Sequence, residues 1–304
     1  MFDKLIHKIA HIYDTKYKQL FYLSIVIFIL SLIVIGEHYV ETEEFVSKGV
    51  SLKGGTTLTL VDSINTDEMA SFLIAKYPHS DINVRSLSKA GASDGAMIEA
   101  SDITPEQLLS SVEEKIGMLD KSKYTIDTTG SSLGQSFFNQ AILAVIAAFV
   151  LMSIVVYLYF RDPYPSFYVI FCVFADMMFA LAVFVWFDMR LTTAGVAAFL
   201  MLIGYSIDTD ILLTTRVLKR TEGTVSQRMA SAIPTGMTMT FAAIVAVVVG
   251  YYSTSSEVMK QIMFILIWGL FADVIFTWMF NASLLRMHVE SLEKKKAQVA
   301  ENGN

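Results

Sequence analysis

The chain alternates between apolar and polar segments, and the apolar segments are long enough to cross a membrane. A helix needs about 20 apolar residues to span a hydrocarbon core about 30 Å thick. Six stretches approach or exceed this length: residues 20–35, 137–160, 166–187, 191–215, 233–252 and 258–285. The last stretch is long enough to tilt or to emerge from the bilayer. The pattern predicts a polytopic α-helical membrane protein with six transmembrane helices.

The first apolar stretch has two possible roles, because it follows several lysines as the apolar part of a signal peptide would. No small-x-small cleavage site follows it, and the chain continues Gly36-Glu37-His38-Tyr39. We therefore expect an uncleaved membrane anchor.

Basic residues in the short loops predict the orientation, since Lys and Arg are enriched on the cytoplasmic side. Thirteen of them lie in the N-terminal segment, the loops after the second and fourth spans, and the tail. The opposite short loops offer only Arg190 and Lys260. We therefore expect a protein of the plasma membrane with both termini on the cytoplasmic side. The segment between the first two spans should lie outside the cell.

That segment is one long hydrophilic insert, with 16 acidic and 8 basic residues. Alternating, β-prone residues at 57–61, 82–87, 96–100 and 123–128 predict strands, and residues 66–76 and 104–116 predict helices. The order βαββαβ is that of a ferredoxin-like α+β domain. The resulting division is a cytoplasmic segment 1–19, helix one 20–35, the extracytoplasmic domain 36–136, helices two to six 137–285 and a cytoplasmic tail 286–304.

The amino-acid composition argues against some classes of protein. Of the 304 residues, 54% are hydrophobic and 17% are charged, whereas a soluble domain carries about 25% charged residues. This disfavours a disordered chain and a nucleic-acid-binding protein. The only cysteine, Cys172, has no intrachain disulfide partner and lies in an apolar run, so we expect it to be packing.

Four carboxylates inside the predicted spans are the candidate functional residues: Asp176, Asp208, Asp210 and Asp273. An ionised group at the bilayer centre costs about 2.5–3.5 kcal/mol even on insertion scales. These acids are therefore candidates for proton coupling. The alternative is that they are hydrogen-bonded links between helices.

The helical geometry of the fourth span separates two of these acids. At 100° per residue, Asp208 and Asp210 lie 200° apart, so at most one faces the interior of the helix bundle. We favour Asp208 as the functional acid, because Gly204 and Thr215 on its face leave room for water or a facing helix.

Two motifs carry a resemblance to the SecD/SecF family. Residues 49–56, GVSLKGGT, resemble the glycine motif that follows the first span of that family, through Gly49, Gly54 and Gly55. The fourth span resembles the fourth-span motif of SecF. Its matching residues are Gly204, Tyr205, Ser206, Thr209 and Arg216. The layout of six spans with one external domain matches along the whole chain, and the insert of about 100 residues is similar to SecF rather than to the larger SecD.

The resemblance implies a non-enzymatic subunit of a resistance-nodulation-division type complex, in the form found in archaea. Its partners would be a SecD-like subunit, the Sec translocon, unfolded exported proteins and membrane lipid, and its driving force the proton gradient. No cofactor or metal is implied. The chain departs from the bacterial pattern: Thr209 stands at the proton-coupling aspartate, Thr215 at a second aspartate, and Ser51 at the aspartate of the glycine motif. The resemblance therefore does not carry proton coupling over to a particular residue.

Two other functions compete with this one. A related pump that moves lipids or small molecules usually carries two large external domains per chain, whereas this chain has one. An intramembrane enzyme would need catalytic residues in the spans, and they contain no Ser/His pair, His-Glu-x-x-His or Gly-x-Gly-Asp signature.

Overall fold

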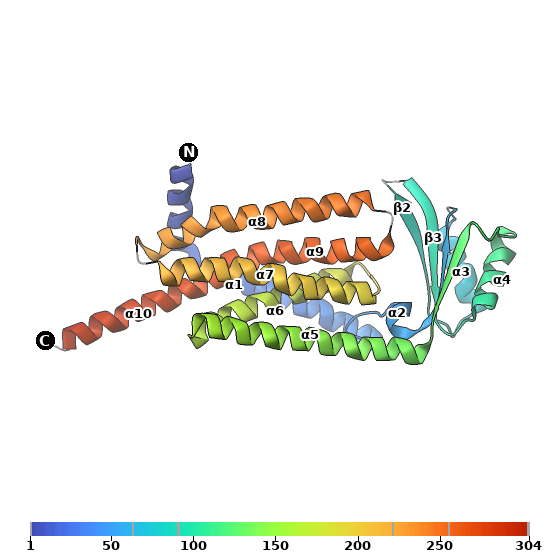
Figure 1. The fold of residues 1–304 in the computed structure, drawn as a ribbon, viewed down its shortest axis with the longest axis horizontal. Helices are drawn as coiled ribbons and strands as arrows, with labels where there is room; N and C mark the ends of the chain where they lie inside the picture. The colour runs from blue at the N-terminus through green and yellow to red at the C-terminus, as the bar shows by residue number, and fades with distance from the viewer. Residues whose placement is uncertain (1, 63, 90–91, 221, 255, 303–304) are drawn as a thin grey trace.

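The computed structural model describes residues 2–62, 64–89, 92–220, 222–254 and 256–302. A bundle of long helices occupies one end of the molecule and a small antiparallel sheet the other (Figure 1). Six helical segments are long and apolar enough to cross a membrane, as the hydrophobic pattern predicts. They are Tyr13–Thr42, Ser131–Phe160, Pro163–Trp186, Thr193–Lys219, Val225–Ser253 and Glu257–Lys295.

The helices extend beyond the predicted apolar stretches because polar residues continue and cap them. The first five are α1 (Phe2–Thr42), α5 (Ser131–Phe160), α6 (Pro163–Trp186), α7 (Thr193–Lys219) and α8 (Val225–Ser253). Thr224 begins α8 with a capping box, in which its side chain and that of Gln227 bond each other's main-chain N–H groups. Cys172 is fully buried in α6, as expected of a packing residue.

The sixth span is one continuous helical run of three parts: α9 (Glu257–Ile275), the π-helix η1 (Phe276–Asn281) and α10 (Ala282–Asn302). A π-helical turn is wider than an α-helical turn and often occurs at functional sites. It lies in the middle of this span, where buried polar side chains gather.

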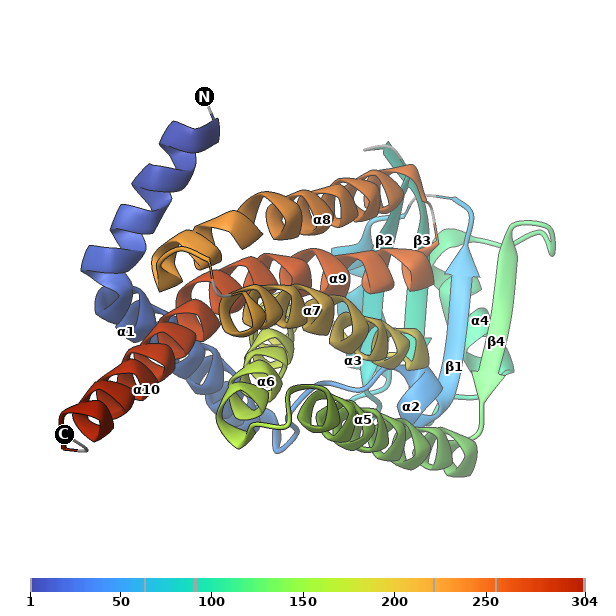
Figure 2. The same cartoon turned by 60° about the vertical axis from the view of Figure 1, so that its left-hand side comes forward.

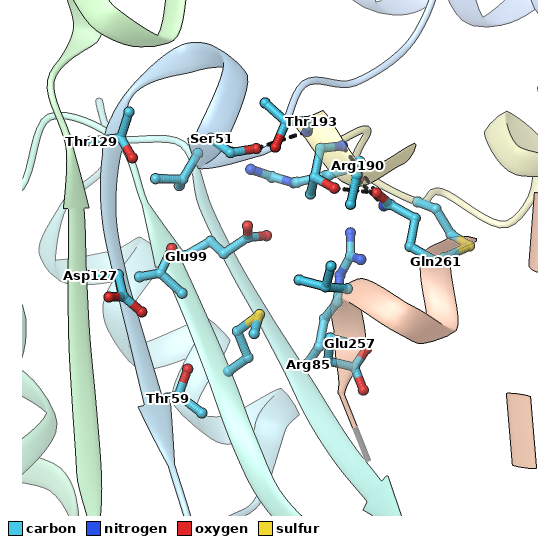
Figure 3. A pocket seen from close by; sticks show the side chains of 17 residues that line it. Ser51, Thr59, Arg85, Glu99, Asp127, Thr129, Arg190, Thr193, Glu257 and Gln261 are labelled. Carbon is cyan, nitrogen blue, oxygen red and sulfur yellow. Dashed lines mark hydrogen bonds between the residues drawn. The ribbon is translucent and has the colours of Figure 1, made fainter. Parts of the chain in front are cut away.

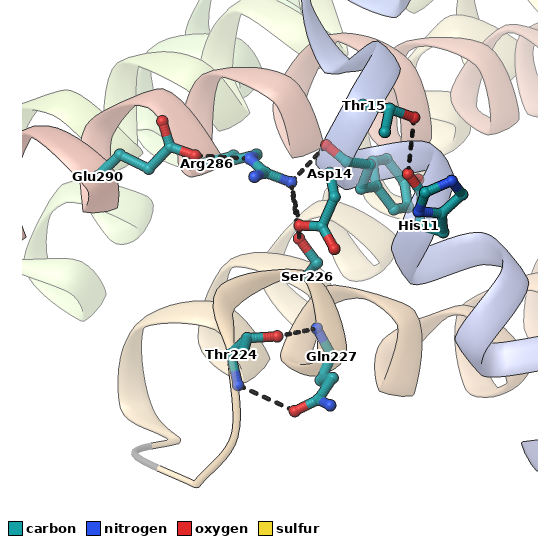
Figure 4. Close-up of polar contacts among 9 residues, drawn as sticks. His11, Asp14, Thr15, Thr224, Ser226, Gln227, Arg286 and Glu290 are labelled. Atoms are coloured by element: carbon teal, nitrogen blue, oxygen red, sulfur yellow. Dashed lines mark hydrogen bonds and ion pairs between the residues drawn. The ribbon is translucent and has the colours of Figure 1, made fainter.

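Helix α1 bends, and its N-terminal part turns away from the rest of the bundle (Figures 1 and 2). Arg286 on α10 fixes the chain near this bend (Figure 4). Its Nη1 lies within hydrogen-bonding distance of the main-chain oxygen of Tyr13, of Asp14 Oδ1 at 2.7 Å and of Ser226 Oγ at 2.7 Å. One guanidinium thus joins α1, α8 and α10.

The sheet end contains α2 (Val50–Lys53) and then four strands and two helices at the predicted places. These are β1 (Gly55–Leu60), α3 (Thr66–Lys76), β2 (Ile82–Lys89), β3 (Ala92–Ala100), α4 (Pro105–Ile116) and β4 (Tyr124–Thr129). The strand order is β2-β3-β1-β4 and every pairing is antiparallel.

The two faces of the sheet differ in polarity, because side chains alternate along a strand. Leu58 and Ile98 are fully buried in the apolar core beneath α3 and α4. Thr57, Thr59 and Glu99 point the other way, toward the helix bundle, and line a cavity there. Figure 2 shows the sheet standing across the ends of the long helices.

Main-chain contacts attach the sheet end to the bundle. The Gly49 N–H donates to the Leu191 oxygen at 2.8 Å, and the Leu191 N–H donates to the Ser47 oxygen at 2.7 Å. Gly54 has a φ of +94°, and a Cβ there would lie 2.4 Å from Ser131 Cα at the start of α5. The glycine motif is therefore where the chain turns from α2 into β1 close against another backbone.

Candidate functional site

A cluster of buried polar side chains lies in the middle of the helix bundle, where α6, α7, α8 and the sixth span meet. Three of the four candidate acids belong to it, and each is 0% exposed. The members are Asp176 on α6; Ser206, Thr209, Asp210 and Thr214 on α7; Thr240 on α8; and Asp273, Thr277 and Asn281 on the sixth span.

Asp210 is held by two donors from the π-helical turn. Thr277 Oγ1 donates to Asp210 Oδ1 at 2.9 Å, and Asn281 Nδ2 donates to the same oxygen at 2.7 Å. Asn281 Nδ2 also lies 3.4 Å from Thr214 Oγ1, one turn along α7. Asp210 and Asp273 lie at similar depth, about 24–26 Å along their helices from Thr193 and Glu257 at 1.5 Å per residue.

Asp273 shares one of these donors with Asp210. Thr277 Oγ1 lies 3.0 Å from Asp273 Oδ1, and Thr240 Oγ1 donates to Asp273 Oδ2 at 3.3 Å. A hydroxyl group has a single proton, so Thr277 donates to only one of the two carboxyl groups. Its contact with the other is favourable when that carboxyl group is protonated and donates instead. The geometry therefore fits a pair of acids of which at least one carries a proton.

Asp176 extends the cluster to α6. Ser206 on α7 donates a hydrogen bond to Asp176 Oδ2, and Ser206 precedes Asp210 by one helical turn. Asp176 Oδ1 and Asp210 Oδ2 are buried and have no hydrogen-bond partner among the described residues. Both oxygen atoms can therefore take a further proton or donor.

Basic side chains do not neutralise these acids. In the part of the chain that the structure describes, Asp176, Asp210 and Asp273 form no ion pair with Lys, Arg or His. Among the described residues, their hydrogen-bond partners are hydroxyl and amide groups. Such a set can hold and exchange protons, because each carboxyl group has a hydroxyl partner that both donates and accepts.

Of the cluster members on the sixth span, sequence reasoning found Asp273 but missed Thr277 and Asn281. Asp273, Thr277 and Asn281 follow one another at intervals of four residues, which places them on one face of a helix. The same helical-wheel argument applied to the sixth span would have found this stripe. The π-helical turn that brings it against Asp210 has no comparable signal in the sequence.

Asp208 lies apart from the cluster. It is exposed, with Gly204 and Tyr205, on the outer face of α7. It lines a cavity of about 490 Å³ with Tyr159, Thr215, Arg216 and other residues near the end of α7 away from the sheet. One acid of the pair faces the interior, as the 200° separation predicts, but that acid is Asp210. The expectation that Asp208 faces the interior is wrong.

The remaining residues of the fourth-span motif divide between the two faces of α7. Ser206 and Thr209 are buried in the cluster, and Thr209 Oγ1 lies 3.5 Å from Thr240 Oγ1. A Cβ at Gly204 would meet no atom within 4 Å. Thr209 thus borders Asp273 through Thr240.

Comparison with known proteins gives consistent results along the chain. Residues 109–291 match the family described as protein export membrane protein SecD/SecF, C-terminal. Two archaeal relatives are both described as protein-export membrane protein SecF. The one from Thermococcus gammatolerans is 36% identical, covering 92% of this chain and 91% of the relative. The one from Pyrococcus furiosus is 34% identical, with 92% and 93% covered.

A solved structure shares the fold. It is SecDF, a translocon-associated membrane protein from Thermus thermophilus, with a TM-score of 0.71 at 15% sequence identity. The similarity covers 90% of this chain, which spans 38% of the length of that protein. The family match and the archaeal relatives together show that the chain belongs to the SecD/SecF family of protein-export membrane proteins, in its SecF branch.

Proposed function

We propose that the chain is the SecF-type subunit of a SecD-SecF complex that assists Sec-dependent protein translocation across the cytoplasmic membrane. It acts without enzymatic activity or a cofactor, and it draws on the proton gradient through the buried cluster. The observation that carries the proton step is the Asp210–Thr277–Asp273 arrangement. Two acids share one hydroxyl, so a proton can pass between α7 and the sixth span when the helices shift.

The partner is a SecD-like subunit that covers the outer face of α7. An exposed aspartate is unfavourable against lipid, since charged side chains in transmembrane segments almost always face protein or water. Gly204 has open space beside it, and small residues allow close helix approach. Asp208 then serves this interface with the partner rather than the buried proton site.

The sheet end is a ferredoxin-like domain outside the cell, and both termini are cytoplasmic. The element order βαββαβ and the antiparallel order β2-β3-β1-β4 support this fold. Labelling intact cells tests the orientation: a cysteine in place of Lys123, in a chain with Cys172→Ser, should react with an impermeant maleimide before lysis. Reaction only after lysis would reverse the topology.

Deletion and co-purification test the function. A strain without the chain should export a secreted reporter more slowly, and affinity purification of the tagged chain should recover a SecD-like subunit. Recovery of a lipid or small-molecule pump subunit, with unchanged export, would favour the competing transport function.

A further inference from the structure

A cavity lies between the polar face of the sheet and the ends of α7 and α9, and the proposed function does not involve it. Its volume is about 300 Å³, at the lower end of the range for ligand pockets. Thr57, Thr59, Glu99 and Arg85 line it from the strands, and Gln261 lines it from α9 (Figure 3). Its walls therefore come from two parts of the molecule and from segments far apart in the sequence.

Glu99 is the most informative residue of this cavity. Its side chain enters from β3 and is only 7% exposed. Within the described chain, it makes no hydrogen bond or ion pair. Burying a carboxylate without a partner is unfavourable. The carboxylate of Glu99 is therefore available to accept hydrogen bonds from a molecule in the cavity.

Arg85 on the neighbouring strand β2 is available as a hydrogen-bond donor. Its Nη2 is buried without a hydrogen-bond partner among the described residues. Burial lowers the pKa of Arg85, and the charge of Arg190 lowers it further, whereas the charge of Glu99 raises it. Arg85 and Glu99 attract each other, yet they do not form an ion pair across the cavity.

The remaining lining residues add adaptable surface. Met97, Met189 and Val258 contribute apolar side chains, and methionine fits varied shapes because it is flexible and polarizable. Arg190, which also lines the cavity, is already paired with Asp81 at 2.6 Å. In the described residues, no group of three or more His, Cys, Asp or Glu side chains could hold a metal ion. The lining therefore fits an organic ligand with both donors and acceptors.

We propose that this cavity binds a short extended segment of exported polypeptide through its main chain. Peptide N–H groups donate to Glu99, and peptide carbonyl groups accept from Arg85. The methionines accommodate different side chains, so recognition is independent of client sequence. This inference rests on the proposed export function, because it requires unfolded chains to emerge beside the sheet end.

Binding to the purified complex tests the proposal. The full chain and its partner are placed in lipid nanodiscs. The probe is a fluorescein-labelled peptide of serine, threonine and valine, about ten residues long, with acetylated and amidated ends. We expect saturable binding by fluorescence anisotropy, and a dissociation constant about ten-fold higher for Glu99→Gln and for Arg85→Gln. The matched control is Asp127→Asn, which removes an exposed acid from the same cavity and should change the constant less than two-fold.

Thermal stability separates binding from a structural role. Because neither Glu99 nor Arg85 forms a hydrogen bond or ion pair among the described residues, Glu99→Gln and Arg85→Gln should change the melting temperature little while they weaken binding. A lower melting temperature together with unchanged peptide affinity would assign both residues to the fold alone. Competition by free serine but not by an unlabelled capped peptide would overturn main-chain recognition in favour of a small zwitterion.

The export assay keeps this inference distinct from the proposed function. If deletion of the chain slows export but the complex does not bind the peptide, the cavity proposal fails and the function stands. If deletion leaves export unchanged, the function fails. Cross-linking then gives an independent readout: benzoylphenylalanine at Met97 in the cavity should capture an arrested reporter, whereas at Met118, 97% exposed elsewhere on the domain, it should not.

Discussion

Replacing Asp210 with asparagine should abolish gradient-dependent export while leaving the fold intact. The asparagine Oδ1 can still accept from Thr277 and Asn281, which bond Asp210 at 2.9 and 2.7 Å. Its amide group takes the position of Oδ2, which has no partner among the described residues. A protonated carboxyl group would place a donor at that position as well, so we expect a stability change within about 1 kcal/mol.

Asp210→Ala should behave differently, because it removes the acceptor. Thr277 can turn to Asp273 Oδ1 at 3.0 Å, but Asn281 keeps only the 3.4 Å contact with Thr214. Essentially one buried donor loses its partner, which costs about 1–3 kcal/mol. The alanine variant should therefore lose both stability and coupling, and the asparagine variant only coupling.

The assay is the export rate of a secreted reporter with and without an uncoupler, with thermal unfolding measured on the purified variants. One proton moving down a potential of 100 mV supplies about 2.3 kcal/mol. A variant that no longer transfers this proton should therefore lose most of its gradient-dependent export rate. Asp208→Asn is the control: it removes an exposed acid from the same helix but keeps the shape and hydrogen-bonding capacity that the partner interface needs, so it should keep gradient-dependent export. Parental, uncoupler-sensitive export in both Asp210→Asn and Asp273→Asn strains would refute proton transfer through this pair.

Three further outcomes follow from the packing. Gly236→Val should destabilise the chain by about 1–3 kcal/mol in thermal unfolding, because its Cβ would lie 2.5 Å from the Trp278 ring. The isolated chain should tolerate Gly204→Ala, and an equal loss of stability in the two variants would contradict this packing. Arg286→Gln should cost about 1.5–3 kcal/mol and expose α1 to proteolysis, since it breaks the charge-assisted hydrogen bonds that hold Tyr13 and Asp14. An unchanged digestion pattern would argue against this. Partial burial raises the pKa of Asp81, but its bonds to Arg190 and Lys53 outweigh this and hold the pKa below its ordinary value of 3.8. The two ion pairs of Asp81 should contribute fully to stability above pH 3.8, and this contribution should be lost as the pH falls through the lower pKa of the folded state. In thermal melts recorded from about pH 5 to pH 2, Arg190→Gln should reduce this acid sensitivity.

The sequence by itself determined the framework of the molecule. Membrane spans could be located because the bilayer imposes one length and one polarity on every crossing helix. The elements of the small domain could be located because strand alternation and helix caps are local properties, as with Thr104 as the cap and Pro105 as the first residue of α4. The helical wheel also determined that Asp208 and Asp210 face opposite directions.

Only the tertiary structure decided which of the two acids faces inward. A helical wheel gives the angles between residues but not the rotation of the helix about its own axis. That rotation depends on how α7 packs against α6, α8 and the sixth span. The π-helical turn likewise depends on packing, and it brings Thr277 and Asn281 from the sixth span to Asp210. The cavity of Glu99 and Arg85 was beyond sequence reasoning for the same reason: its walls come from strands and helices that meet only after the sheet stands on the bundle.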